Sequence, residues 1–97
     1  MPTYVVLFNW TEQGIRNYRE SPRRVEAAET EMEKSGVRIK DLYWTLGPYD
    51  LVGVVEASDD DALTRSLLAL GAQGNVRTTT LRAYGREEFP RLIEGAG

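Results

Sequence analysis

The chain has 97 residues, of which 41% are hydrophobic and 28% are charged, and its formal net charge is −3. This length and balance predict one globular domain over residues 1–97 rather than a disordered chain. Cysteine and histidine are both absent. Their absence excludes disulfides, iron–sulfur ligation and thiol catalysis, and it removes the commonest metal ligand and the commonest neutral-pH base. We therefore expect no cofactor and no metal site.

The first half of the chain predicts a strand, a helix and a second strand. Residues 3–10 are β-branched and aromatic, which is typical of a strand. Ser21 and Pro22 mark a helix start, because serine can cap free N–H groups and proline tolerates the first helical position. Gly36 would end this helix with a left-handed cap. Residues 37–46 follow as the second strand.

The second half predicts two strands separated by a helix. A corner at residues 47–49 leads into a third strand over residues 50–57. The run Ser58-Asp59-Asp60-Asp61 opens a helix, because its negative charges complement the positive helix N-terminus. A fourth strand is expected over residues 75–84, and a short helix over residues 87–93.

This order predicts an α+β fold of the ferredoxin-like type, βαββαβ. The expected sheet is antiparallel and four-stranded, in the order 4-1-3-2, with two helices on one face and an additional short C-terminal helix. Strands 3–10 and 50–57 are the most apolar, which favours the central positions. Strands 37–46 and 75–84 carry charge, as edge strands do to discourage aggregation.

Both faces of the predicted sheet carry apolar side chains, although the two helices can cover only one. An uncovered apolar face of this size usually marks an interface. We therefore expect a homo-oligomer, either a dimer with stacked sheets or a larger ring. In strand 3–10, one face of the sheet is expected to carry Tyr4, Val6, Phe8 and Trp10 and the other face Val5 and Leu7. In strand 37–46, one face is expected to carry Val37, Ile39 and Tyr43 and the other face Leu42, Trp44 and Leu46.

The acidic balance and the hydropathy pattern limit the other partners. A nucleic-acid binder usually shows a basic excess or stripe, but the basic cluster here is interleaved with glutamates, so we expect no nucleic-acid partner. No apolar run approaches the roughly 20 residues that span a bilayer, and the N-terminus lacks a basic region, so we expect no membrane partner and a cytoplasmic location. The cluster comprises Arg16, Arg19, Arg23 and Arg24, interleaved with Glu12, Glu20, Glu26 and Glu29.

Four chain segments converge at one end of the predicted sheet and form the candidate site. Aromatic walls with a few convergent polar groups are typical of a small-molecule pocket. Asp50 and Tyr49 are the candidate catalytic, proton-handling residues. The candidate ligand-binding residues are Asn9, Trp10, Trp44, Gln73, Asn75 and Arg77.

Structural interpretations of the same residues remain open. Asp50 could cap the turn that Gly47 and Pro48 form, and the two tryptophans could be core or interface residues. Gln73 and Asn75 could belong to a polar turn, and Arg77 could guard an edge strand, pair with Asp50 or clamp an anionic ligand.

Several motifs resemble the GYD-domain family across nearly the whole chain. They are Tyr4-Val5-Val6-Leu7 followed by Asn9-Trp10-Thr11, residues 21–27, Gly47-Pro48-Tyr49-Asp50 and residues 74–83. The resemblance implies a ferredoxin-like α+β domain related in shape to the dimeric α/β-barrel group. It implies no particular activity.

Three functions are therefore compatible with the sequence. The first is a binding or assembly module, a homo-oligomer that holds a small molecule at its aromatic end or at its subunit interface. The second is a cofactor-free enzyme of the dimeric α/β-barrel type, monooxygenase- or isomerase-like, in which Asp50 or Tyr49 handles a proton and Arg77 clamps the substrate. The third is a purely structural oligomer. A cavity beside Asp50 would distinguish them.

Overall fold

A computed structural model describes residues 1–97 and contains one four-stranded antiparallel sheet. The strand order β2-β3-β1-β4 is the predicted 4-1-3-2 order, so the ferredoxin-like prediction is confirmed. The elements are β1 (Thr3–Trp10), α1 (Glu12–Arg16), the 3-10 helix η1 (Tyr18–Glu20), α2 (Ser21–Lys34), β2 (Val37–Trp44), β3 (Leu51–Ala57), α3 (Asp60–Ala72), β4 (Val76–Ala83) and α4 (Phe89–Gly95).

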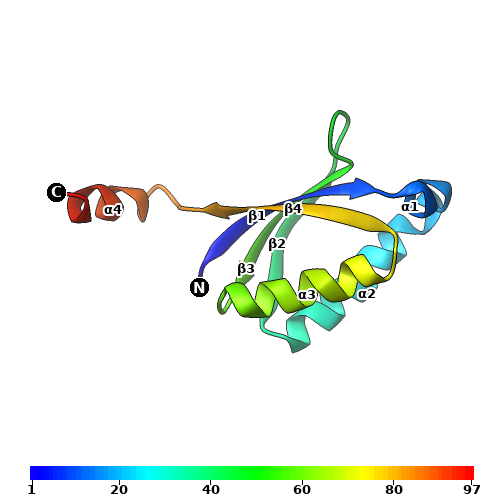
Figure 1. The fold of residues 1–97 in the computed structure, drawn as a ribbon, viewed down its shortest axis with the longest axis horizontal. Helices are drawn as coiled ribbons and strands as arrows, with labels where there is room; N and C mark the ends of the chain where they lie inside the picture. The colour runs from blue at the N-terminus through cyan, green and yellow to red at the C-terminus, as the bar shows by residue number, and fades with distance from the viewer.

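The elements form two layers with two projections (Figure 1). Helices α2 and α3 lie side by side under one face of the sheet, and no helix covers the other face. The β2–β3 hairpin rises on the side away from these helices, and α4 stands off the body at the end opposite α1. None of the helices combines the length and the hydropathy that a membrane span requires.

The core lies between the sheet and the two long helices. Side chains alternate between the two faces of a strand, so every second residue of β1 and of β3 points toward the helices. The buried cluster consists of Tyr4, Val6, Phe8, Met32, Val37, Leu51, Val55, Ala57, Ala62, Leu63 and Val76. The predicted division of β1 into Tyr4, Val6 and Phe8 on one face and Val5 and Leu7 on the other is confirmed.

The predicted division of β2 is wrong beyond its middle, because the strand contains a β-bulge. Ile39 pairs with Val55 and Asp41 pairs with Val54, so Lys40 is an extra residue that resets the alternation. Leu42 and Trp44 therefore share the helix-covered face with Val37 and Ile39, and Tyr43 points to the other face. Leu46 lies beyond the end of the strand.

Ser21 does not cap α2 as predicted. The helix continues directly from η1 with Glu20 before it, and no side chain caps its N-terminus. The Ser21 hydroxyl instead accepts a hydrogen bond from Trp44 Nε1 at 2.9 Å, which ties the end of β2 to the start of α2. At α3, Asp59 does cap the helix by accepting from the Ala62 N–H at 2.8 Å.

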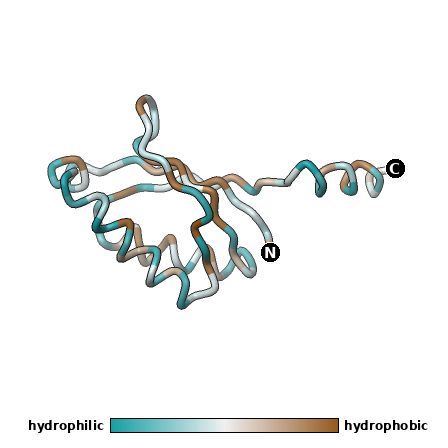
Figure 2. The backbone as a smooth tube through the Cα atoms, turned by 180° about the vertical axis from the view of Figure 1, so that it is seen from behind, coloured by the Kyte–Doolittle hydropathy of each residue, from teal (hydrophilic) through white to brown (hydrophobic).

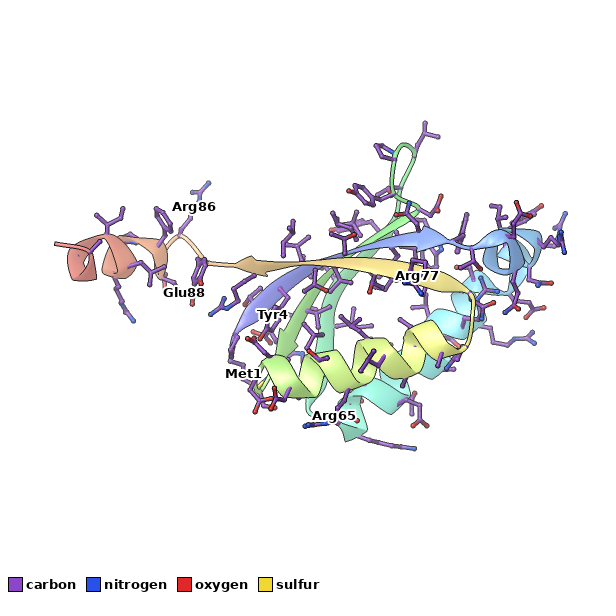
Figure 3. The ribbon with its side chains drawn as sticks, viewed as in Figure 1. Met1, Tyr4, Arg65, Arg77, Arg86 and Glu88 are labelled. Carbon is purple, nitrogen blue, oxygen red and sulfur yellow. The ribbon has the colours of Figure 1, made fainter.

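A buried tyrosine couples the stability of the fold to alkaline pH. The Tyr4 hydroxyl donates to the Asp60 carboxylate at the start of α3. Figure 3 shows Tyr4 between the sheet and this helix. This hydrogen bond, followed by burial, raises the pKa of Tyr4 from 10.0 to about 12. The folded state therefore holds the proton more tightly than the unfolded state does, and its stabilising effect is complete below about pH 10.

We expect this stabilisation to decline as the pH rises from about 10 to about 12. Tyr4→Phe should remove this part of the alkaline sensitivity while lowering stability at neutral pH, because Asp60 loses its donor. Denaturation by urea on both sides of about pH 10 measures the effect. Tyr84→Phe, at an exposed tyrosine, is the control. Equal alkaline losses in the wild type and in Tyr4→Phe would show that the Tyr4–Asp60 bond does not cause them.

Candidate functional site

The predicted corner is bound to the end of β1 by hydrogen bonds. The Asp50 N–H donates to the Phe8 carbonyl at 2.8 Å, and Asn9 Nδ2 donates to the Pro48 carbonyl at 2.7 Å. Because β3 begins only at Leu51, the Trp10 N–H has no strand partner on this side, and it donates to Asp50 Oδ2 at 2.8 Å. The Asp50 carboxylate thus extends the β1–β3 ladder by one bond.

This geometry predicts how substitutions of Asp50 affect stability. Asp50→Asn keeps an oxygen that can accept from the Trp10 N–H, so it should cost less than about 1 kcal/mol, whereas Asp50→Ala leaves the donor unpaired and should cost about 1–3 kcal/mol. Urea denaturation of the three proteins measures the difference. If Asp50→Ala were as stable as Asp50→Asn, the bond would contribute nothing to the fold.

On its other edge, the end of β1 is joined to the turn before β4. The Thr11 N–H donates to the Asn75 carbonyl at 3.1 Å, and the Thr11 hydroxyl donates to the Gly74 carbonyl at 2.5 Å. Gln13 Nε2 donates to Asn75 Oδ1 at 2.9 Å. The predicted residue Asn75 therefore holds the structure together through both its backbone and its side chain.

Gly14 makes this junction possible, and sequence reasoning did not identify it. A Cβ atom at this position would lie 2.0 Å from the Asn75 carbonyl oxygen and 3.2 Å from Trp10 Cδ1. The Thr11 hydroxyl caps α1 by accepting from the Gly14 N–H at 3.1 Å, and this local pattern could have located the start of the helix. The approach of the Asn75 carbonyl to Gly14 is a tertiary contact, so no local signal in the sequence indicates it.

A small cavity lies between the sheet and α2, with a volume of about 50 Å³. Three of the predicted site residues, Trp10, Gln73 and Asn75, line it, but Asp50 and Tyr49 do not. The remaining lining residues are Phe8, Ser21, Arg24, Val25, Ala28, Met32, Ile39, Leu42, Leu51, Leu70 and Val76.

Two of the residues that line the cavity carry polar groups that bear on ligand binding, the indole of Trp10 and the guanidinium of Arg24. The buried indole N–H of Trp10 finds no acceptor among the protein atoms. The guanidinium of Arg24 donates from Nη1 to the Asn17 carbonyl at 2.8 Å and from Nη2 to the Gly14 carbonyl at 3.4 Å. The cavity is therefore mostly apolar, with one cation among its lining residues, and Trp10 lines it with an indole N–H that is itself buried.

The other predicted residues lie outside this cavity. Trp44 uses its indole N–H on Ser21, and the Tyr49 carbonyl accepts from the Thr45 hydroxyl at 2.6 Å within the hairpin. Arg77 lies on β4 (Figure 3), where it pairs with Asn9, and it lines a separate hollow against α3. The suggested pairing of Arg77 with Asp50 is wrong, because Arg77 takes part in no salt bridge. No cluster of acidic side chains suited to a metal ion occurs.

The uncovered side of the sheet forms a second candidate site, which we call the open sheet face. At its centre are four half-buried apolar side chains from the two central strands, Val5, Leu7, Val52 and Val54. Tyr43 on β2 and Leu81 on β4 border them and are more exposed. Because no element of the chain covers these side chains, this face is an apolar surface of the sheet that is available to a partner.

Comparison with known proteins agrees with the fold and identifies the family. A protein of Thermus thermophilus named "Glutamine synthetase and cystathionine beta-lyase binding protein" is 42% identical over 84 residues, which cover 86% of this chain and 88% of that protein. The crystal structure of FFRP-DM1 has a TM-score of 0.60 at 19% identity, covering 87% of this chain and 100% of that one. MtbAldR has a TM-score of 0.61 at 15% identity, covering 88% of this chain and 52% of that one. At these identities the two structures show the fold alone. The GYD domain family matches residues 4–93, and the chain belongs to that family.

Proposed function

We propose that this protein is a homo-oligomeric protein-binding module that attaches to a metabolic enzyme. The relative that is 42% identical is named for binding glutamine synthetase and cystathionine β-lyase, and the matched region covers most of both chains. We extend that kind of partner, an enzyme surface, to this chain. This proposal corresponds to the first of the three functions compatible with the sequence, the binding or assembly module.

The open sheet face is the observation that carries the homo-oligomeric part of the proposal. Its central side chains, Val5, Leu7, Val52 and Val54, remain in contact with solvent although they lie on the two middle strands. At about 25 cal/mol per Å², covering a patch of a few hundred Å² contributes on the order of 10 kcal/mol before the costs of association. Stacking two such faces is the simplest way to cover them, and it leaves the helical sides of the dimer outward for an enzyme.

The geometry of the corner gives less support to an enzymatic function. The Asp50 carboxylate accepts a hydrogen bond from the Trp10 backbone, and neither Asp50 nor Tyr49 lines the cavity. The cavity volume of about 50 Å³ is also small beside the roughly 300–1,000 Å³ of most ligand pockets.

Binding can be tested with the glutamine synthetase and the cystathionine β-lyase of the organism that encodes this chain. Each enzyme is immobilised, and this protein is passed over it at low micromolar concentration. We expect saturable binding to at least one enzyme and none to an unrelated immobilised enzyme of similar charge. If neither enzyme binds, the proposed attachment to these two enzymes is wrong, and the proposal loses the partners that the relative's name suggests.

A small-molecule function is the second candidate, and the unpaired indole N–H of Trp10 favours it. A very small molecule with one hydrogen-bond acceptor would pair with that donor by widening the cavity, whose volume is about 50 Å³. Such a ligand should raise the melting temperature of the wild type but not of Trp10→Phe, which lacks the donor. Equal shifts in both proteins would place the ligand elsewhere.

A further inference from the structure

The C-terminal segment makes no hydrogen bond with the rest of the chain. Every residue from Tyr84 to Gly97 is exposed. The hydrogen bonds of residues 85–97 stay within that segment, as between the Phe89 N–H and the Gly85 carbonyl at 3.0 Å. Figure 1 shows α4 standing clear of the sheet and of the helical layer. Nothing in its own chain supports this helix.

A helix this short needs a surface to pack against. It has seven residues, whereas isolated helices shorter than about 12–15 residues are only marginally stable in water. Its large apolar side chains are Phe89, Leu92 and Ile93, which are 53%, 48% and 59% exposed. Their spacing of three and four residues places them on one face of the helix. This face is a docking face without a partner in its own chain.

The tip of the β2–β3 hairpin is a second unsupported apolar element. Leu46 is fully exposed at the tip, and Tyr43 on the adjacent open sheet face is 61% exposed. Figure 2 shows the hydrophobic tip on the side of the sheet away from the helices. The hairpin and α4 lie at opposite ends of the strands, because Leu51 pairs with Phe8 at one end and Ala83 pairs with Thr3 at the other.

We propose that α4 is an exchanged arm, which packs on the hairpin of a second copy of this chain. The proposal rests on the stacked dimer of the proposed function. If two open sheet faces stack with their strands running in opposite directions, the hairpin of each copy projects toward the α4 end of the other. The apolar face of α4 then covers the hairpin tip of the other copy with Phe89, Leu92 and Ile93. The two-fold symmetry of the dimer repeats this contact, so it occurs twice.

The area of this contact supports a second copy as the occupant. A stable interface buries about 800 Å² on each partner. The central side chains of the open sheet face are already half-buried in the monomer, so stacking them covers only the area that remains exposed, and a further contact between the copies would enlarge the interface. The three arm side chains are each about half exposed, so they add further apolar area, roughly 100 Å² for Phe89 alone. Because the contact is reciprocal, each copy gains both the arm surface and the hairpin surface.

The absence of cysteine allows a direct cross-linking test. We would co-express Leu46→Cys with a tagged Leu92→Cys chain and treat the purified mixture with a short bis-maleimide. The two single variants can join only between chains, and the tag identifies the mixed product. The matched control pairs Leu46→Cys with a tagged Leu68→Cys chain, because Leu68 is 68% exposed on α3, on the helical side.

The expected result is a shift of the Leu46→Cys and Leu92→Cys pair to the position of the mixed dimer, with only background product from the control pair. Light scattering on the same samples separates the two proposals. A dimer mass without the mixed product would overturn the exchanged arm and leave the stacked dimer intact. A monomer mass would overturn both. Equal yields from the two pairs would also overturn the arm contact, because they would indicate random collision.

Discussion

Gly14→Ala should destabilise the protein by about 3 kcal/mol, which lowers its melting temperature by roughly 10–20 °C. The added Cβ would lie 2.0 Å from the carbonyl oxygen of Asn75, a backbone atom that cannot rotate away. That same oxygen accepts the hydrogen bond from the Thr11 N–H. Relief of the clash must therefore separate α1 from the turn that leads into β4. Thermal and urea denaturation measure the loss.

Gly71→Ala is the matched control for this substitution. It makes the same chemical change inside a helix, but no atom lies within 4 Å of the added Cβ. Since alanine favours the helix over glycine, this variant should be neutral or more stable by about 0.5–1 kcal/mol. A Gly14→Ala protein as stable as Gly71→Ala would contradict the close packing of α1 on Asn75.

Leu7→Lys should convert the proposed dimer into monomers. Leu7 lies on the central strand β1 at the middle of the open sheet face, where it pairs with Val52 and Thr79. In a monomer the long lysine stem can lie along the sheet while its charge reaches water, so the fold should survive. In a stacked dimer two such charges would face each other without partners, which costs several kcal/mol. Circular dichroism and light scattering report on the fold and the mass separately.

The control for this variant is Leu68→Lys on the solvent side of α3. It adds the same charge to the same residue type, on the face away from the proposed interface. We expect it to keep the mass of the wild type. If both lysine variants, or neither of them, changed the mass, the open sheet face would not be the specific contact.

The layout of the sheet could be predicted because its causes are local. Alternating apolar residues define β1 and β3 as central strands, and charged residues such as Arg38 and Arg77 mark the edge strands. Asp59 marks the start of α3, because its side chain caps the helix through a hydrogen bond to a residue only three positions along the chain. Patterns of this kind, in the spacing of apolar residues and in the residues at helix ends and turns, can be recognised from the sequence alone.

The errors arose where a distant contact overrides a local pattern. The bulge at Lys40 shifts Leu42 and Trp44 to the helix-covered face, where Leu42 packs against the core and the Trp44 indole donates to Ser21. Ser21 resembles a helix cap, but it accepts from Trp44, which lies in another element. Nothing local to Gly14 shows that the Asn75 carbonyl approaches it.

The candidate site was predicted at the level of chain topology but not at the level of chemistry. The end of β1, the corner before β3 and the turn before β4 do converge, as the bonds of Asp50 to Trp10 and of Gln13 to Asn75 indicate. Side-chain direction decides which residues share a cavity, and it depends on strand register and on backbone hydrogen bonds. Asp50 is turned toward the β1 backbone for that reason, whereas Trp10 lines the cavity.

The central claim is that the open sheet face of this protein closes on a second copy. The most direct measurement is the mass of the unmodified protein by light scattering coupled to size exclusion at micromolar concentration. The account predicts at least twice the chain mass of 10.9 kDa, stable on dilution through the low micromolar range. A single species of 10.9 kDa under those conditions would contradict it.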